Sequence, residues 1–369
     1  MSIFSMEHVW KKTETNFELK NVSLSILEDE WLLISGPVGE GKEVLQKVIL
    51  GFDNDWDGLI CLNKKNIKNY EGYAEKIAFI HNRFIEEKGS ETIFDYLALP
   101  LKIKGKTEIE IRKEINNVHK QFMNIVELTK KMKDLSLQEK VSVSFLKAIL
   151  MNPSLIVIDE PFYQLSNSKR KLILETFKDN LRNWKGCPVV IFSSYILEWL
   201  PFCDRIAVFK ENGLLQIGEP QVLIEHPQHA FVAKYLHGED FTLLKGILKG
   251  NRFITEGFSF LLPKQVLQDY LFFEGQELVL GMMATSFQIV DKPISDTIGL
   301  TFKAPIHIFY EKNGFYKVYS NIGHFPLVAQ IKINGKINEG EQVQLFFPFD
   351  HLLFFDGNTE KKINAKRLI

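Results

Sequence analysis

The chain has 369 residues, of which 45% are hydrophobic and 25% are charged; this globular composition excludes a disordered or collagen-like chain. Its 45 basic and 46 acidic residues give a formal net charge of −1, so we expect no nucleic-acid partner. Three widely separated cysteines exclude a disulfide scaffold and a zinc ribbon and favour a reducing compartment. No signal peptide is expected, and no apolar run approaches the roughly 20 residues that a membrane-spanning helix needs.

The first elements form a strand–turn–helix unit. Phe17–Ile26 alternates between apolar and polar residues, and Trp31–Ser35 is a short apolar run that ends in a glycine-rich turn. Glu43–Leu50 then has helical spacing. This order is typical of the phosphate-binding α/β unit. From about residue 91 to residue 150 the pattern is helical, and the charge-dense segment Lys102–Phe122 is expected to form a solvated amphipathic helix.

Two continuous apolar runs, Leu155–Pro161 and Pro188–Ser194, flank a helical segment at Lys169–Leu181. Apolar strands separated by a helix indicate a parallel sheet that is covered on both faces. Arg205–Pro220 then predicts a hairpin with its turn at Asn212–Gly213.

From Phe241 onward the pattern changes to short alternating strands, which predicts a separate, mostly β domain of a small-barrel type. Turn signals between these strands occur at Asn313–Gly314, Asn334–Gly335 and Asp356–Gly357.

The glycine-rich turn fits the phosphate-loop pattern G-x-x-x-x-G-K, because its residues are Gly36, Pro37, Val38, Gly39, Glu40, Gly41, Lys42 and Glu43. Its glycines allow backbone N–H groups to converge on phosphate oxygens, and the following helix adds its positive end. Lys42 would reach the β- and γ-phosphates. Glu43, however, stands where a serine or threonine hydroxyl normally coordinates Mg²⁺.

The two carboxylates of this loop change its electrostatics. Two unit charges about 4 Å apart interact by roughly 4 kcal/mol at an effective dielectric constant near 20, so Glu40 and Glu43 would oppose much of what Lys42 contributes. Glu43 has two possible roles. A carboxylate ligates Mg²⁺ in place of the hydroxyl, or it pairs with a nearby lysine and closes the site; the sequence leaves both open.

The run LIVIDEP carries a second set of polar residues. Asp159 ends a buried strand, where a carboxylate holds Mg²⁺ directly or through water. Glu160 follows at the place where a general base polarises an attacking water, so it is the candidate catalytic base.

With these motifs in place, the chain resembles the ATP-binding-cassette (ABC) ATPases, and more narrowly the ATPase subunits of carbohydrate importers of the maltose type. The phosphate loop, LIVIDEP and the segment Gly218–Leu236 follow the family's order, and Val279–Val290 and Asp350–Ile363 resemble its accessory domain. The resemblance implies an α/β P-loop cassette at residues 1–238, with a helical subdomain at about residues 91–150. It implies an all-β, oligonucleotide-fold-like domain at residues 239–369.

The family also implies ligands and partners. ATP and Mg²⁺ are held between two cassettes in a head-to-tail dimer, here a heterodimer with a second cassette or a homodimer. Transmembrane permease subunits dock on the helical subdomain. The resemblance therefore predicts a cytoplasmic protein that is peripheral on the inner face of the cell membrane.

The sequence departs from the family at several functional positions. The signature that caps the partner's ATP reads LSLQE and lacks both glycines: its residues are Leu135, Ser136, Leu137, Gln138 and Glu139. The switch histidine corresponds to Tyr195, and the aspartate of the loop after LIVIDEP corresponds to Ser166. Asn82 stands at the position of the metal-sensing glutamine, and Trp10 stands at that of the adenine-stacking aromatic.

Three interpretations follow. The chain is a cassette with degraded catalytic residues that serves as a structural or regulatory subunit on a permease, with weak or absent hydrolysis. Alternatively, it is an active ATPase that uses Glu43 as an unusual metal ligand. In the third interpretation it is a pseudo-ATPase regulator that is not attached to a transporter. Because both the phosphate-loop half and the signature half are altered, we expect slow hydrolysis even beside an intact partner cassette.

Overall fold

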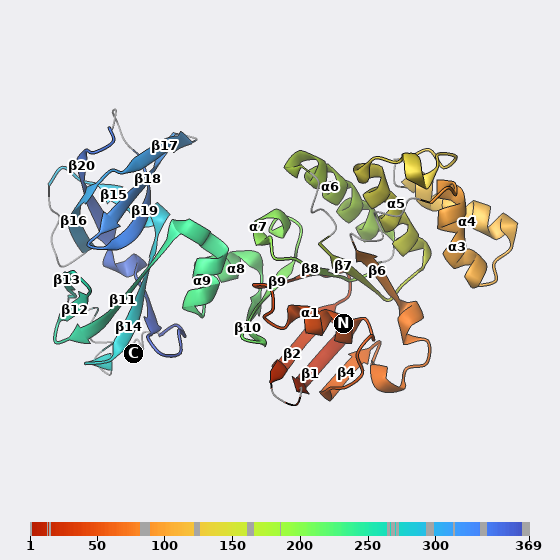
Figure 1. The fold of residues 1–369 in the computed structure, drawn as a ribbon, viewed down its shortest axis with the longest axis horizontal. Coiled ribbons are helices and arrows are strands. Elements are labelled where there is room, and N and C mark those ends of the chain that lie inside the picture. The colour runs from red at the N-terminus through yellow and green to blue at the C-terminus, as the bar shows by residue number, and fades with distance from the viewer. Residues whose placement is uncertain are drawn as a thin grey trace. The chain divides into compact units, whose positions relative to one another are not determined.

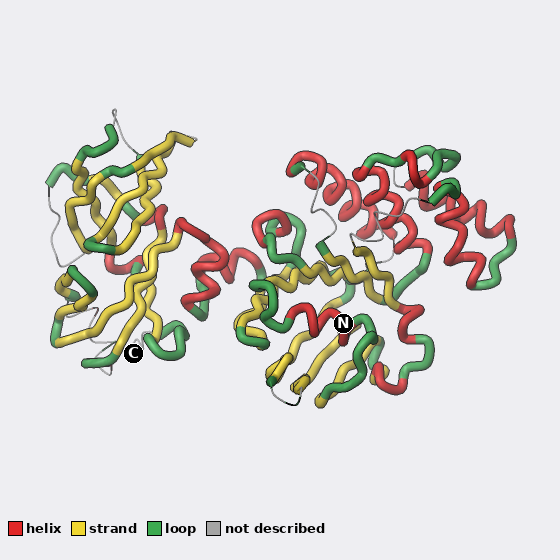
Figure 2. Tube along the Cα trace, viewed as in Figure 1, coloured by secondary structure: helices red, strands yellow, loops and turns green. Residues whose placement is uncertain are grey.

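The computed structural model describes residues 2–12, 14, 16–81, 89–121, 126–160, 166–184, 186–263, 266, 270, 273–292, 299–312, 314–332 and 338–363. The chain divides into two compact units, Met1–Pro220 and Gln221–Ile369 (Figures 1 and 2). Each unit contains a hydrophobic core of its own.

A six-stranded sheet forms the centre of the first unit, in the order β10-β9-β3-β8-β7-β6. Its strands are β3 (Trp31–Ser35), β6 (Ile77–His81), β7 (Leu155–Asp159), β8 (Val189–Phe192), β9 (Arg205–Lys210) and β10 (Gly213–Gly218). Only β10 pairs antiparallel with its neighbour. Every residue of β3 and β8 is buried, as the continuous apolar runs predict for parallel strands covered on both faces.

A second, antiparallel sheet lies below helix α1 (Lys42–Ile49) in the view of Figure 1. Its strands are β1 (Ser2–Lys12), β2 (Phe17–Leu27), β4 (Asp57–Leu62) and β5 (Lys65–Asn66). The α1 side chains Leu45, Val48 and Ile49 are fully buried in one core with residues of both sheets. This packing fixes the start of α1, and with it the phosphate loop that precedes α1.

The remaining helices are α3 (Ile93–Ile103), α4 (Glu108–Gln121), α5 (Leu137–Leu150), α6 (Asn167–Trp184), α7 (Ile196–Trp199), α8 (Pro220–Glu225) and α9 (Ala230–His237). Helices α5 and α6 cover the face of the large sheet opposite α1 (Figure 1). There Phe177 of α6 packs edge-on against Trp31 of β3, with ring centroids 6.2 Å apart. Within the described part of the chain, none of the helices is both long and apolar enough to cross a membrane.

The charged segment Lys102–Phe122 differs from the single helix that its periodicity predicts. Helix α3 ends at Ile103, Gly105 adopts a positive φ of 73°, and α4 begins at Glu108. Thr107 and Glu110 then cap the new helix, because the Glu110 carboxylate accepts the Thr107 N–H at 2.8 Å. A glycine in the left-handed region and a capping pair therefore end one helix and begin another.

The second unit is built from antiparallel sheets, as the alternating pattern predicts. The five-stranded sheet contains β11 (Phe241–Lys249), β12 (Arg252–Thr255), β13 (Phe258–Leu261), β14 (Glu277–Met283) and β21 (Leu353–Asp356). Two three-stranded sheets contain β15 (Gln288–Ile289), β16 (Gly299–Pro305), β17 (Ile308–Lys312), β18 (Phe315–Ile322), β19 (Phe325–Ile331) and β20 (Gln342–Pro348). Helix α9 packs Ala230 and Ala233 against Phe241, Val279 and Phe355 of the five-stranded sheet.

The β9–β10 hairpin turns one residue earlier than its sequence predicts. Glu211 and Asn212 both have positive φ, at 54° and 65°, and Gly213 already pairs with Lys210. Among the other expected turns, Gly314 joins β17 to β18 and Gly357 follows β21, whereas Asn313 and Asn334–Gly335 lie outside the described residues.

Candidate functional site

The phosphate loop connects β3 to α1 and has the backbone that its glycines predict. Gly39 and Gly41 adopt positive φ angles of 83° and 91°. Gly36 lies so close to β9 that a Cβ atom there would be 2.4 Å from the Phe209 carbonyl oxygen. Pro37 is half-buried, and the Val38 side chain is exposed at the tip of the loop. Strand, loop and helix thus form the context that a G-x-x-x-x-G-K motif requires.

The charged residues at the end of this loop bind each other. The Lys42 side chain is only 8% exposed, and its ammonium donates a hydrogen bond to Oε1 of Glu43. The Gly39 N–H donates to the same oxygen at 3.4 Å. Burial raises the pKa of the Glu43 carboxyl, but the hydrogen bonds and the Lys42 charge outweigh burial, so the pKa lies below its ordinary value. Glu43 is therefore ionised at neutral pH and contacts the groups that a P-loop offers to phosphate.

Glu40 points to a different partner. Its carboxylate accepts the backbone N–H of Glu211 in the β9–β10 turn. Gly41 packs against the same turn, since a Cβ atom there would be 2.9 Å from the Cα of Asn212. The loop is thus joined to the hairpin beside it.

Asp159 and Glu160 lie at the carboxyl end of β7, at the edge of the sheet from which the phosphate loop also leaves β3. Asp159 Oδ2 lies 3.2 Å from Nε2 of His81, the residue paired with it on the parallel strand β6. Glu160 adopts a positive φ of 41° and accepts hydrogen bonds from the Ser194 N–H at 2.7 Å and the Ser193 hydroxyl at 3.1 Å. Burial raises the pKa of Glu160, and the hydrogen bonds from Ser194 and Ser193 lower it. Burial is the larger effect, so the pKa lies above its ordinary value.

His81 is the neighbour that sequence reasoning missed. Nothing in the run IAFIH marks it, but it ends β6 as Asp159 ends β7. In parallel strands, residues that end neighbouring strands meet at one edge. The parallel order of β6 and β7 was the signal that could have identified it.

Tyr195, at the switch-histidine position, begins the short helix α7. Its backbone N–H donates to the Ser193 hydroxyl at 3.1 Å, while the Ser193 carbonyl accepts the Ser35 hydroxyl at 2.7 Å. The Tyr195 side chain is 54% exposed. Ser193 therefore links the carboxyl ends of β3, β7 and β8.

The signature residues begin α5 in the helical part of the first unit. Leu135 is buried, and Ser136 and Glu139 form a reciprocal capping box around Leu137 and Gln138. The Glu139 carboxylate accepts the Ser136 N–H at 2.8 Å and pairs with Lys130 at 2.7 Å. Burial raises the pKa of Glu139, but the bonds from Lys130 and Ser136 outweigh burial and the pKa is lowered.

Two of the predicted residues, Trp10 and Ser166, lie elsewhere in the described part of the chain. Trp10 is in β1, opposite Asp57 of β4, with its ring partly exposed. Ser166 precedes α6, and its hydroxyl lies 3.4 Å from that of Ser168. Asn82 lies outside the described residues.

The donor set fits ATP and Mg²⁺ only in part. Asp159 and Glu43 supply oxygen ligands of the kind that Mg²⁺ prefers. Lys42 and the Gly39 N–H, which a polyphosphate would use, are bound by Glu43. In this arrangement the loop accepts an outside anion only after Glu43 releases Lys42.

The chain is similar in sequence to known ATP-binding subunits of transporters. Residues 19–163, within the first unit, match the ABC transporter family, so the first unit carries an ABC transporter domain. The chain is 24% identical to the trehalose/maltose import ATP-binding protein MalK of Thermococcus litoralis, over 96% of this chain and 98% of that protein. It is 25% identical to the molybdate/tungstate import ATP-binding protein WtpC of Pyrococcus abyssi, over 91% and 95%. The spermidine/putrescine import ATP-binding protein PotA of Thermotoga maritima is 30% identical, over 63% and 62%.

Solved structures show the same fold. CbiO1 of Clostridium perfringens, part of an ABC transporter complex, superimposes with a TM-score of 0.57 at 22% identity, over 61% of this chain and 91% of that one. An ATP-binding cassette of an ABC transporter in its ADP conformation gives a TM-score of 0.54 at 21% identity, over 65% and 100%. The chain therefore combines an α/β ATP-binding cassette with a C-terminal all-β region, as the sequence predicts.

Proposed function

We propose that this chain is the nucleotide-binding subunit of an ABC importer that hydrolyses ATP slowly or not at all and acts as a structural or regulatory cassette. The ABC transporter domain and the named importer relatives support the transport role. The contact of Glu43 with Lys42 and the Gly39 N–H carries the proposal of weak catalysis.

The charge of Glu43 and its position in the loop both disfavour catalysis. Catalysis of phosphoryl transfer depends almost entirely on groups that are already aimed at the developing charge. Here the ammonium of Lys42 is neutralised by a carboxylate of the same loop. A nucleotide must displace that carboxylate and then tolerate its charge nearby. Both effects weaken binding before any chemistry begins.

The signature half supports the same conclusion. The free N–H groups at a helix N-terminus are the groups that attract phosphate. In α5, the Glu139 carboxylate takes the Ser136 N–H, and the Ser136 hydroxyl accepts the Glu139 N–H at 3.3 Å. The Glu139 carboxylate therefore caps this end of α5. Because the carboxylate and a phosphate bound to a partner cassette are both negative, they would repel each other.

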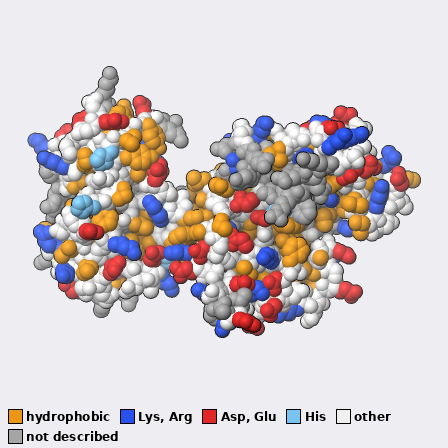
Figure 3. Space-filling model, in the orientation of Figure 1, with side chains coloured by type: hydrophobic (Ala, Val, Ile, Leu, Met, Phe, Trp, Pro, Cys, Tyr) orange, Lys and Arg blue, Asp and Glu red, His pale blue; other side chains and the backbone are white. Residues whose placement is uncertain are grey.

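The proposed partners are permease subunits and a second cassette, in a heterodimer or a homodimer, on the inner face of the cell membrane. Exposed apolar side chains of α3 and α4 offer a docking surface for the permease: Ile103 is 78% exposed and Ile109 is 81% exposed. Figure 3 shows hydrophobic side chains at the surface over the end of the molecule where these helices lie.

The proposal is tested by titrating the purified full chain with ATP, with and without Mg²⁺, in the native form and as Glu43→Ser. We expect Glu43→Ser to bind ATP at least about tenfold more tightly, because Lys42 is released and the hydroxyl is restored. Glu43→Gln is the matched control that removes the charge but keeps the size, and it should lie between the two.

Steady-state phosphate release separates the two catalytic interpretations. We expect the native chain, alone and with its partner cassette, to turn over more slowly than the roughly 1–10³ s⁻¹ of ordinary enzymes. Turnover inside that range, abolished by Glu43→Ser, would instead show that Glu43 works as a metal ligand.

A further inference from the structure

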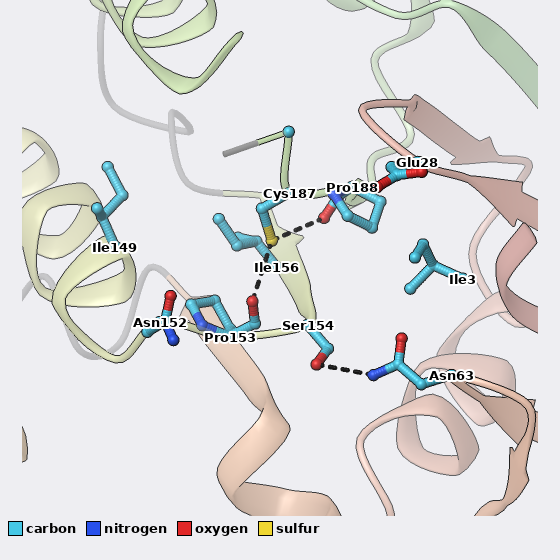
Figure 4. A pocket seen from close by; sticks show the side chains of 11 residues that line it. Ile3, Glu28, Asn63, Ile149, Asn152, Pro153, Ser154, Ile156, Cys187 and Pro188 are labelled. Carbon is cyan, nitrogen blue, oxygen red and sulfur yellow. Dashed lines mark hydrogen bonds between the residues drawn. The ribbon is translucent and has the colours of Figure 1, made fainter. Parts of the chain in front are cut away.

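A cavity lies near the residues that precede β7 and β8, whereas the phosphate loop follows β3, so the two are at opposite ends of these parallel strands. Figure 4 shows the side chains that line the cavity. Its volume is about 200 Å³. A cavity of about 150 Å³ holds a molecule the size of benzene, so this one admits a slightly larger ligand. Ile3, Ile149 and Ile156 supply apolar walls, and Glu28 and Asn63 supply polar ones.

The cavity lies at the beginning of β7, which ends at Asp159, and of β8, which pairs with it. Pro153 and Ser154 precede β7, and Cys187 and Pro188 precede β8. A strand rises about 3.3 Å per residue, so Ile156, the lining residue of β7, is roughly 10 Å from Asp159 along the strand. A ligand here would not touch the phosphate loop.

Among the residues that the structure describes, negative groups gather on the side of the cavity where Cys187 lies. Helix α6 ends at Trp184, just before Gly186, and a helix C-terminus carries partial negative charge. The Glu28 carboxylate lines the cavity, and the Asp29 carboxylate fills the space beside Gly186, where a Cβ atom would lie only 1.4 Å from its Oδ1. Burial, with the Asp29 charge as a second cause, raises the pKa of Cys187 to about 12, so the thiol stays neutral.

The helix α5 also ends at the cavity, but its negative end has a counter-charge. Lys104 donates a hydrogen bond to the Met151 carbonyl, which caps α5. Lys104 does not line the cavity. The negative charge that remains is therefore on the side formed by Glu28, Asp29 and the end of α6.

Hydrogen-bond acceptors face the cavity beside this charge. The Asn63 amide N–H donates to the Ser154 hydroxyl at 3.0 Å, which leaves its Oδ1 oxygen to accept (Figure 4). The Pro153 carbonyl accepts the weak thiol donor of Cys187 at 3.6 Å. The Pro188 carbonyl, 3.7 Å from the same thiol, already accepts the backbone N–H of Ile156 at 3.0 Å.

Glu28 and Asn63 lie on either side of Ile3, and Ile156 and Ile149 extend the apolar wall away from them (Figure 4). A carboxylate and an amide oxygen next to isoleucine side chains suit a ligand with an N–H-bearing cation and a short aliphatic body.

We propose that this cavity is a binding site for a small aliphatic ammonium compound, separate from the nucleotide site. The ammonium faces Glu28, the Asn63 oxygen and the Pro153 carbonyl, and the aliphatic body packs on Ile3, Ile149 and Ile156. The ligand would contact Ile156 of β7 and the residues that precede β7 and β8. Its effects would therefore reach β7, the strand that ends at Asp159 and is followed by Glu160.

The test titrates the full chain with n-butylammonium chloride by calorimetry and follows labelled isoleucine methyl groups by NMR. We expect saturable binding with a dissociation constant on the order of 1 mM, with shifts at Ile3, Ile149 and Ile156. Glu28→Gln, in an exposed turn, should weaken binding about fivefold or more. Asn63→Ala, which removes an acceptor, should weaken it about threefold.

Matched controls make the result decisive. Glu256→Gln removes the same charge from an exposed turn of the second unit and should change the affinity by less than about twofold. n-Butanol and butyrate share the aliphatic body but lack the cation, and both should bind more weakly. Equal binding of n-butanol, an unchanged affinity in Glu28→Gln, or shifts confined to other isoleucines would overturn the proposal. The ATP titration reads a different site, so either proposal can fail alone.

Discussion

Glu43 is one side chain that decides whether the phosphate loop is open to an outside anion. Its neighbours in sequence predict the loop, because glycine spacing fixes the backbone and Lys42 follows the last glycine. They do not predict which way the carboxylate turns, since metal ligation and ion pairing need the same residue type. In the structure the carboxylate turns inward, to Lys42 and the Gly39 N–H.

The lowered pKa of Glu43 predicts how this contact depends on pH. The folded-state pKa lies below that of the unfolded chain, about 4.3. The contact with Lys42 therefore contributes stability that is complete above about pH 4.3 and is lost as the pH falls through the folded-state pKa. In urea unfolding at pH 7, we expect the free energy of unfolding of the native protein to exceed that of Glu43→Gln by no more than about 1 kcal/mol. The difference is small because the Glu43 side chain is 42% exposed and its charge is screened by solvent.

The stability difference should narrow as the pH falls below about 4.3. It should also shrink in about 1 M salt, where the Debye length falls to about 3 Å. A stability difference that stays constant across pH and salt would mean that the Glu43→Gln substitution changes packing rather than charge.

At the scale of elements, the sequence predicts the positions of the buried strands, but it does not predict a helix break or a turn position that depends on one backbone angle. Continuous apolar runs place β3, β7 and β8 well, because a strand buried on both faces has no polar position. The break between α3 and α4 and the one-residue shift of the β9–β10 turn depend on positive φ angles at Gly105 and Glu211. Periodicity does not encode such angles. The pairing of His81 with Asp159 depends on strand order, which no local pattern gives.

The exposed apolar side chains of α3 predict an interface. We expect Ile103→Asp to abolish co-purification of the chain with its permease subunits, because a charge would replace a 78% exposed isoleucine at the proposed docking surface. The measurement is the amount of permease recovered with tagged chain from detergent-solubilised membranes.

The control is Ile308→Asp, at a 58% exposed isoleucine of β17 in the second unit, which should leave recovery unchanged. If native chain recovers no permease at all, the interpretation as a regulator detached from transport is favoured over a docked cassette.

On the scale of the whole molecule, two cores account for the two compact units. One core joins α1 to both sheets of the first unit, and the other fills the antiparallel sheets of the second. The change from continuous apolar runs to alternating ones after residue 240 predicts this change of architecture. The boundary expected between residues 238 and 239 stays a prediction.

Separate cores predict separate responses to a core mutation. Phe347 of β20 is fully buried in the second core, so Phe347→Ala should cost about 3–5 kcal/mol there. We expect calorimetry to show one thermal transition moved to lower temperature and another nearly unmoved, with Val190→Ala in β8 moving the other transition. A common shift of a single transition in both variants would contradict independent cores.

The hydrogen bond between the Glu40 carboxylate and the β9–β10 hairpin limits which sequence changes the hairpin can tolerate. Glu40 accepts a main-chain N–H, so any amino acid at position 211 that retains an N–H and tolerates the positive φ preserves the link. Proline would remove the donor, and an inserted residue would move it. Descendants of this chain should thus vary freely in the identity of residue 211 while keeping the length of the hairpin constant.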